Sequence, residues 1–178
     1  MESILLFAPL FGVNIWHAAV ICMSKIETGR FASISESALL SPLTLCVHRT
    51  VHVLGALCFI AFGVLIIDVW WPGALLLVLA AVFDVFQALY LNKKTNHRAF
   101  RLRDAHQVLA WTMAVCYMLF CLLFTIHTHV DLWLVASYVG ILLSVIIWNQ
   151  LTRFAYFWVA QMIFFVLTSV MMGISYLS

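Results

Sequence analysis

The sequence predicts an all-α integral membrane protein: six transmembrane helices in one bundle, with both termini outside, on the periplasmic or extracytoplasmic side. Composition supports this class, because 66% of the 178 residues are hydrophobic and 9% are charged, against about 25% charged residues in soluble domains. Apolar stretches long enough to cross a bilayer recur along the chain. All nine Lys and Arg residues fall in or beside alternate gaps between those stretches.

These basic residues predict the orientation of the bundle, because cytoplasmic loops of membrane proteins are enriched in Lys and Arg. The remaining gaps hold only Glu2, Asp68 and Asp131. We therefore expect one domain over 1–178, surrounded by lipid and located in a bacterial inner membrane or plasma membrane. The expected spans are about 4–24, 42–67, 72–91, 105–126, 132–148 and 154–177.

The first span, 4–24, lacks the basic n-region and small-residue cleavage site of a signal peptide, so we expect a retained helix. In the loop that follows, Ser33 and Glu36 have the spacing of a capping box, which predicts a short interfacial helix. Ser41 and Pro42, a cap residue followed by proline, predict the start of the second span.

An outer turn at 68–72 separates the second and third spans, and its Trp70 and Trp71 are expected at the membrane interface, where tryptophan is enriched. A basic inner loop follows the third span. Asp104, with Gln107 three residues later, predicts a capped start for the fourth span. The fourth and fifth spans are joined by a second outer turn, and the fifth and sixth by a short inner one.

Polar side chains are concentrated in the inner half of the spans. An ionisable residue inside a bilayer costs roughly 3 kcal/mol or more, so it marks a function or a paired structural role. We expect imidazoles and a carboxylate from separate helices to meet near the cytoplasmic face. The residues concerned are His17 with Asn14, His48, His52, Asp84 with Gln87, and His106.

His52 and His106 favour one haem b. Ligation by two histidines requires imidazoles at similar depth on neighbouring helices of an apolar bundle, and these two residues open the second and fourth spans, which run in the same direction. Asp84 and Gln87 would orient a ligand imidazole. The leading hypothesis is therefore electron transfer by a membrane oxidoreductase, with a quinone or a membrane redox protein as partner.

This layout resembles that of the cytochrome b561 family, whose six-helix members ligate haem with histidines on alternating core helices. The resemblance covers the arrangement of spans two to five and no sequence motif. A second haem would need histidines on spans three and five, which have none. The resemblance therefore implies at most one haem.

A non-haem metal ion, Zn or Fe, is an alternative for the same cluster. His48 and His52 lie one helical turn apart and can chelate an ion from one face, with His17, Asp84 and His106 completing the set. The protein would then be an electron-transfer protein or a metal-dependent enzyme acting on lipid. No catalytic residue can be named, since the multi-histidine boxes of membrane hydroxylases and desaturases are missing from the sequence.

A third hypothesis is a small-solute or proton-coupled transporter or channel, because acidic and histidine side chains are common in proton relays. Beyond the inner cluster the spans offer few polar groups; spans five and six contribute Ser137, Ser144, Gln161 and Thr168. The fourth hypothesis is a membrane subunit that docks a larger protein. No nucleic-acid partner is expected, because the net charge of +2 comes from residues beside the membrane.

Overall fold

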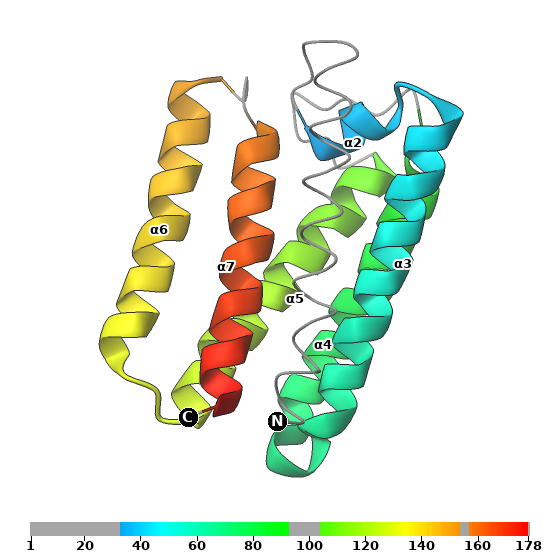
Figure 1. The fold of residues 1–178 in the computed structure, drawn as a ribbon. Helices are drawn as coiled ribbons and strands as arrows, with labels where there is room; N and C mark the ends of the chain where they lie inside the picture. The colour runs from blue at the N-terminus through cyan, green and yellow to red at the C-terminus, as the bar shows by residue number, and fades with distance from the viewer. Residues whose placement is uncertain (1–32, 93–103, 154–156, 178) are drawn as a thin grey trace.

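The computed structural model describes residues 33–92, 104–153 and 157–177, and the regular structure in these ranges is α-helical (Figure 1). Five of the described helices, α3 to α7, are long and apolar enough to cross a membrane. The chain is therefore an integral membrane protein with a helical bundle. The helices are α2 (Ile34–Ala38), α3 (Pro42–Leu65), α4 (Ile67–Tyr90), α5 (Ala105–His127), α6 (Leu132–Leu151) and α7 (Phe157–Leu177).

Five of the six predicted spans correspond to α3 to α7, with ends that differ by a few residues. The predicted first span, 4–24, lies outside the described residues. α6 continues to Leu151, beyond the predicted end at 148, because nothing in that segment interrupts a helix. α4 begins at Ile67, before the predicted start at 72.

Hydrogen bonds at the helix starts confirm the predicted caps. Ser41 Oγ accepts from the backbone N–H of Thr44 at 3.1 Å, and Thr44 Oγ1 accepts from the N–H of Ser41 at 3.0 Å. Pro42 occupies the first position of α3, where its missing N–H has no cost. Asp104 Oδ1 accepts from the N–H of Gln107 at 3.4 Å, so α5 starts as predicted.

The connection between α3 and α4 is tighter than predicted. Trp70 is the non-helical residue (φ −157°, ψ 83°) between a first turn of α4 and its longer part. Trp71 is 67% exposed, as expected of an interfacial tryptophan. Trp70 is half-buried, and its ring folds back over Gly73. That position has no Cβ, and a Cβ there would collide with the indole.

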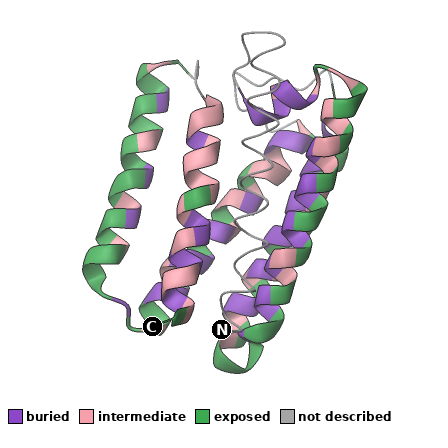
Figure 2. Ribbon diagram, in the orientation of Figure 1, coloured by how far each residue is buried: buried purple, intermediate pink, exposed green. Residues whose placement is uncertain are grey.

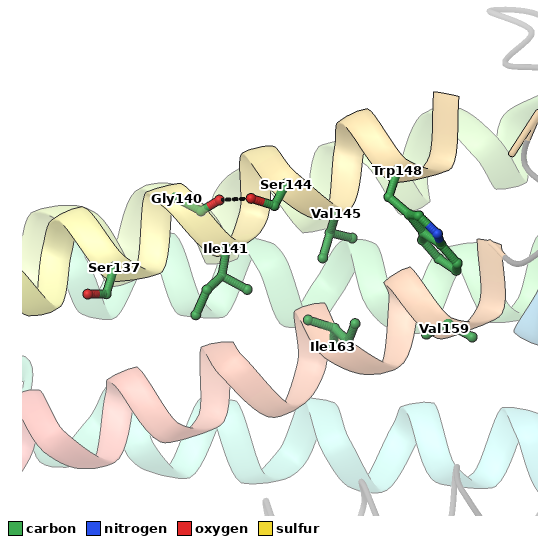
Figure 3. A pocket seen from close by; sticks show the side chains of 8 residues that line it. All are labelled: Ser137, Gly140, Ile141, Ser144, Val145, Trp148, Val159 and Ile163. Carbon is green, nitrogen blue, oxygen red and sulfur yellow. Dashed lines mark hydrogen bonds between the residues drawn. The ribbon is translucent and has the colours of Figure 1, made fainter. Parts of the chain in front are cut away.

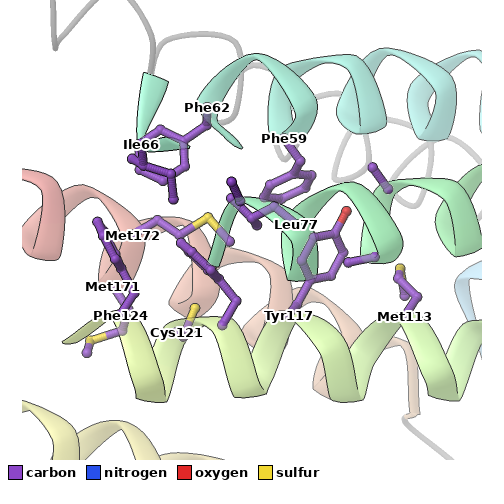
Figure 4. Packing of buried hydrophobic residues seen from close by; sticks show 14 of the residues in the cluster. Phe59, Phe62, Ile66, Leu77, Met113, Tyr117, Cys121, Phe124, Met171 and Met172 are labelled. Atoms are coloured by element: carbon purple, nitrogen blue, oxygen red, sulfur yellow. The ribbon is translucent and has the colours of Figure 1, made fainter. Parts of the chain in front are cut away.

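α4 packs along both α3 and α5, and among the described helices these three are the most closely associated. Gly63 of α3 allows a close approach, since a Cβ there would lie 3.4 Å from the Ala74 carbonyl oxygen of α4. Figure 2 shows buried residues along the facing sides of α3, α4 and α5, whereas α6 is largely exposed. The core contains Phe59, Phe62, Leu77, Tyr117, Phe120, Phe124 and Met172 (Figure 4).

The bundle has two chemically different ends. We call the basic end the one that holds α2, the starts of α3 and α5, Arg49 and the turn at Arg153; it is at the top of Figure 1. The far end holds the α3–α4 and α5–α6 connections, with Asp68 and Asp131. The positive-inside pattern predicts that the basic end faces the cytoplasm.

Candidate functional site

A buried pair of titratable side chains joins α3 to α4 in the half of the bundle nearer the basic end. His52 Nδ1 lies 2.7 Å from Asp84 Oδ1, and the two residues are 3% and 2% exposed. Gln87 Nε2 also donates to Asp84 Oδ1, at 3.2 Å. Asp84 and Gln87 share a face of α4 because they are three residues apart. The predicted convergence of these three residues is therefore confirmed.

The His52–Asp84 contact joins the two helices directly, since His52 Nδ1 and Asp84 Oδ1 are 2.7 Å apart and come from α3 and α4. Partners of this kind are what make a buried polar group tolerable in an apolar bundle.

His48 extends this arrangement toward the basic end. It lies one turn before His52 on α3, and the centroids of the two imidazole rings are 4.3 Å apart with the planes at 67°. The ring is buried, so His48 is not a headgroup residue. The neighbouring Arg49 points elsewhere: its Nε and Nη2 donate to the carbonyl oxygens of Ala88 and Leu89, both at 3.3 Å.

His106 also binds the end of α4. Its Nδ1 lies 2.7 Å from the carbonyl oxygen of Gln87, and because a carbonyl only accepts, Nδ1 carries the hydrogen. Its Nε2 lies 3.0 Å from Ser35 Oγ. The last four carbonyls of a helix have no partner within it. His106 and Arg49 together supply donors to three of those four carbonyls in α4.

The short helix α2 closes the basic end (Figure 1). It begins as predicted, with Ser33 Oγ accepting from the N–H of Glu36 at 3.1 Å. Ser35 contacts His106 of α5, and the N–H of Ile34 donates to Gln161 Oε1 of α7 at 2.9 Å. α2 thus links two helices that are distant in sequence, and sequence reasoning missed the roles of Ser35 and Gln161.

Not all of the predicted metal ligands meet. His48, His52 and Asp84 lie together, and His106 is connected to them through Gln87. His17 lies outside the described residues. Within residues 33–92, 104–153 and 157–177, no three His, Cys, Asp or Glu side chains are arranged to hold one metal ion. The described part of the chain does not supply the metal site by itself.

Haem ligation by His52 and His106 stays a prediction, and the hydrogen bonds of His106 bear on it. Ligation by His52 and His106 requires a ring nitrogen of each residue to point at the iron. Both ring nitrogens of His106 already have a protein partner, the Gln87 carbonyl and Ser35. Haem b, Zn and Fe stay predictions, to be checked by the visible spectrum and metal content of the purified protein. A Soret band lost in both His52→Ala and His106→Ala would support haem.

A groove between α6 and α7 lies apart from these polar residues (Figure 3). Its volume is about 640 Å³ and most of its lining is apolar. Ser144 Oγ donates to the Gly140 carbonyl of its own helix at 2.8 Å, so this hydroxyl is already used. The lining residues are Ser137, Gly140, Ile141, Ser144, Val145, Trp148, Val159 and Ile163. Among these eight residues, the polar side-chain groups are the two serine hydroxyls and the Trp148 indole N–H.

No family model, curated protein or solved structure matches this chain. The likeness to the cytochrome b561 layout therefore has no support beyond the order of the spans. A functional assignment has to come from the side chains at the basic end, and in particular from His52 and Asp84.

Proposed function

We propose that this protein is a proton-translocating channel or a proton-coupled transporter, in which His52 and Asp84 bind and release the proton. The observation that carries the proposal is the 2.7 Å contact between two titratable groups that are both buried within a membrane-spanning bundle. Ionisable residues in such positions are costly, and they recur in proton relays and ion pathways.

His48 provides the step between this pair and the basic end. Its ring is in edge contact with His52, with centroids 4.3 Å apart, and it lies one turn closer to the end of the bundle. Imidazole is the side chain that most readily gains and loses a proton near neutral pH. A proton that leaves His52 therefore has an adjacent acceptor toward the predicted cytoplasmic side.

We also propose the finer topology that the sequence predicts. The segment 4–24 adds a sixth span, both termini lie outside, and the basic end faces the cytoplasm of a bacterial inner membrane or plasma membrane. The distribution of all nine Lys and Arg residues supports this orientation. In this orientation His48 is the member of the relay nearest to the cytoplasm.

Proton flux in liposomes tests the proposal. The protein is reconstituted with a pH-sensitive dye inside, a potassium gradient is imposed, and valinomycin starts the flux. We expect the pH inside liposomes that contain the wild type to change much faster than the pH inside empty liposomes. Asp84→Asn should slow this flux at least tenfold, because an amide cannot exchange a proton with His52.

Asp68→Asn is the matched control, since Asp68 is exposed at the far end. It should conduct at the wild-type rate. Equal fluxes in wild-type and empty liposomes would overturn the proposal. So would an Asp84→Asn protein that folds and conducts normally; the polar contacts would then serve only to hold the helices together.

A further inference from the structure

The buried face of α5 carries three groups that can donate hydrogen bonds between the His52–Asp84 pair and the far end. They are the Tyr117 phenol, the Cys121 thiol and the Thr125 hydroxyl, all fully buried. Successive members are four residues apart and so lie on one face of the helix. At about 1.5 Å of rise per residue, the three extend over roughly 12 Å of bilayer thickness.

Tyr117 is the member nearest to the pair. Its ring packs on Phe59, with centroids 4.3 Å apart, and its hydroxyl reaches from α5 toward α3 and α4 (Figure 4). Tyr117 and Asp84 belong to α5 and α4, which pack along each other. In the described part of the chain its oxygen has no hydrogen-bond partner.

Two further hydroxyls approach Cys121 from neighbouring helices. Tyr138 of α6 and Thr168 of α7 both lie beside its thiol, and Cys121 Sγ is 3.7 Å from the Thr168 carbonyl oxygen. Both hydroxyls are buried. They lie close to each other and to the Cys121 thiol, although none of these hydroxyl contacts meets the distance and angle limits of a hydrogen bond. Among the described residues, Tyr117, Tyr138 and Thr168 thus carry three buried hydroxyls without a hydrogen bond of good geometry.

A bonded pair of hydroxyls continues the series. Thr125 Oγ1 lies 2.9 Å from Ser175 Oγ of α7, one turn beyond Cys121 toward the far end. Both residues are buried. Polar groups on α5, α6 and α7 thus continue from the level of Tyr117 to the last turns of α5 and α7.

We propose that ordered water molecules bind to Tyr117, Tyr138 and Thr168 and link Asp84 to the Thr125–Ser175 pair. A buried hydroxyl that lacks a partner costs about 1–3 kcal/mol, and buried water commonly satisfies such groups. This water chain rests on the proposed function, for which it is the route to the far end. Each oxygen accepts a proton from one neighbour and releases its own proton to the next, so no oxidant or reductant is needed.

Labelling by hydroxyl radicals tests for the water independently of any transport. X-ray irradiation produces the radicals from water in place, so buried side chains react when they touch bound water. In the reconstituted protein we expect Tyr117 and Tyr138 to be modified at least fivefold faster than Phe59 and Phe62, which are equally buried. Equal, slow modification of the four rings would overturn the inference.

Proton flux then tests the route. Tyr117→Phe and Thr168→Val keep the side-chain shape and remove the hydroxyl, and each should slow the flux at least fivefold. Tyr90→Phe and Thr112→Val are matched controls, because Tyr90 is exposed and the Thr112 hydroxyl donates to its own helix at 2.8 Å. Both controls should conduct as the wild type does.

The outcomes separate the two proposals. If Asp84→Asn abolishes flux while Tyr117→Phe and Thr168→Val conduct normally, the water chain is wrong and the proposed function stands. If wild-type liposomes conduct no better than empty ones, both are overturned. Fast labelling of Tyr117 and Tyr138, together with slow flux in the two variants, supports the water chain.

Discussion

The same three helices, α3, α4 and α5, behave differently in their two halves. Toward the basic end they are joined by hydrogen bonds among His52, Asp84 and Gln87. Toward the far end they are joined by aromatic rings: Trp70 stacks on Phe124, with centroids 6.1 Å apart. Apolar side chains gain little by leaving lipid, so the far half depends on close packing. The basic half depends on matched donors and acceptors.

Two histidines show what this difference means. His127, at the far end, is exposed; it stacks on Trp70 with centroids 5.4 Å apart, and its Nε2 lies 3.3 Å from the Val69 carbonyl oxygen. His52 is buried against a carboxylate. A histidine therefore suggests proton chemistry only where burial and a titratable partner occur together, and this chain provides that combination in the basic half.

The largest expected effect comes from breaking the buried pair on one side only. Asp84→Ala leaves His52 and Gln87 without their shared acceptor, and breaking a buried pair costs about 3–5 kcal/mol. The double variant His52→Leu/Asp84→Leu should recover most of this loss, because apolar side chains can replace a buried pair at little cost. Unfolding by SDS in mixed micelles measures both free energies.

Proton flux from the same proteins sharpens the comparison between stability and function. We expect the double variant to fold nearly as well as the wild type and to conduct no protons. If Asp84→Ala were as stable as the wild type, the hydrogen bonds described for the basic half would make no contribution to the free energy of unfolding. Recovery of flux together with stability in the double variant would contradict a role for these residues in proton transfer.

A smaller effect is expected at the far end, where packing rather than hydrogen bonding is at stake. In Gly73→Ala the new Cβ collides with the Trp70 ring, and overpacking of this kind costs about 1–3 kcal/mol. The Trp70 fluorescence should change, because the ring has to leave Phe124 and His127. Proton flux per folded molecule should not change.

Gly140→Ala is the matched control for this substitution. Nothing lies within 4 Å of a Cβ built at Gly140. Replacing glycine by alanine inside a helix should therefore stabilise the protein by roughly 0.5–1 kcal/mol. Equal stability of the two alanine variants would contradict the close packing of Trp70 on Gly73.

The smallest effect concerns the link between α2 and α5. Ser35→Ala removes the hydroxyl that lies 3.0 Å from His106 Nε2, and we expect a loss of about 1 kcal/mol. Ser144→Ala removes a hydroxyl that bonds only its own helix near the α6–α7 groove, and it should cost less than half as much. Equal losses would show that the Ser35–His106 contact is not needed to dock α2.

Much of the fold was predictable because the bilayer restricts the choices. Span length, basic loops and cap residues placed α3 to α7 to within a few residues, and the depths of His52 and Asp84 followed from those spans. Their contact was predictable as a convergence of polar groups. The position of the Trp70 ring was not predictable, because it depends on the missing side chain of Gly73.

The hydrogen-bond partners of His106 could not be predicted from the sequence either. Depth alone made it a partner for His52, whereas in the structure it donates to the Gln87 carbonyl and meets Ser35. Both of those groups become neighbours only when α4 ends beside α5 and α2 folds across them. Sequence spacing gives the depth of a side chain in one helix, but not the rotation of one helix against another.

The most direct test of the central claim is an infrared pH titration of the reconstituted protein. The stretching band of a protonated carboxylic acid is followed as the pH is lowered, and the wild-type spectra are compared with those of Asp84→Asn and Asp68→Asn. We predict a buried carboxylic acid band in the wild type and in Asp68→Asn that is missing in Asp84→Asn and shifted in His52→Gln. Identical titrations of the wild type and Asp84→Asn would contradict proton binding at this pair.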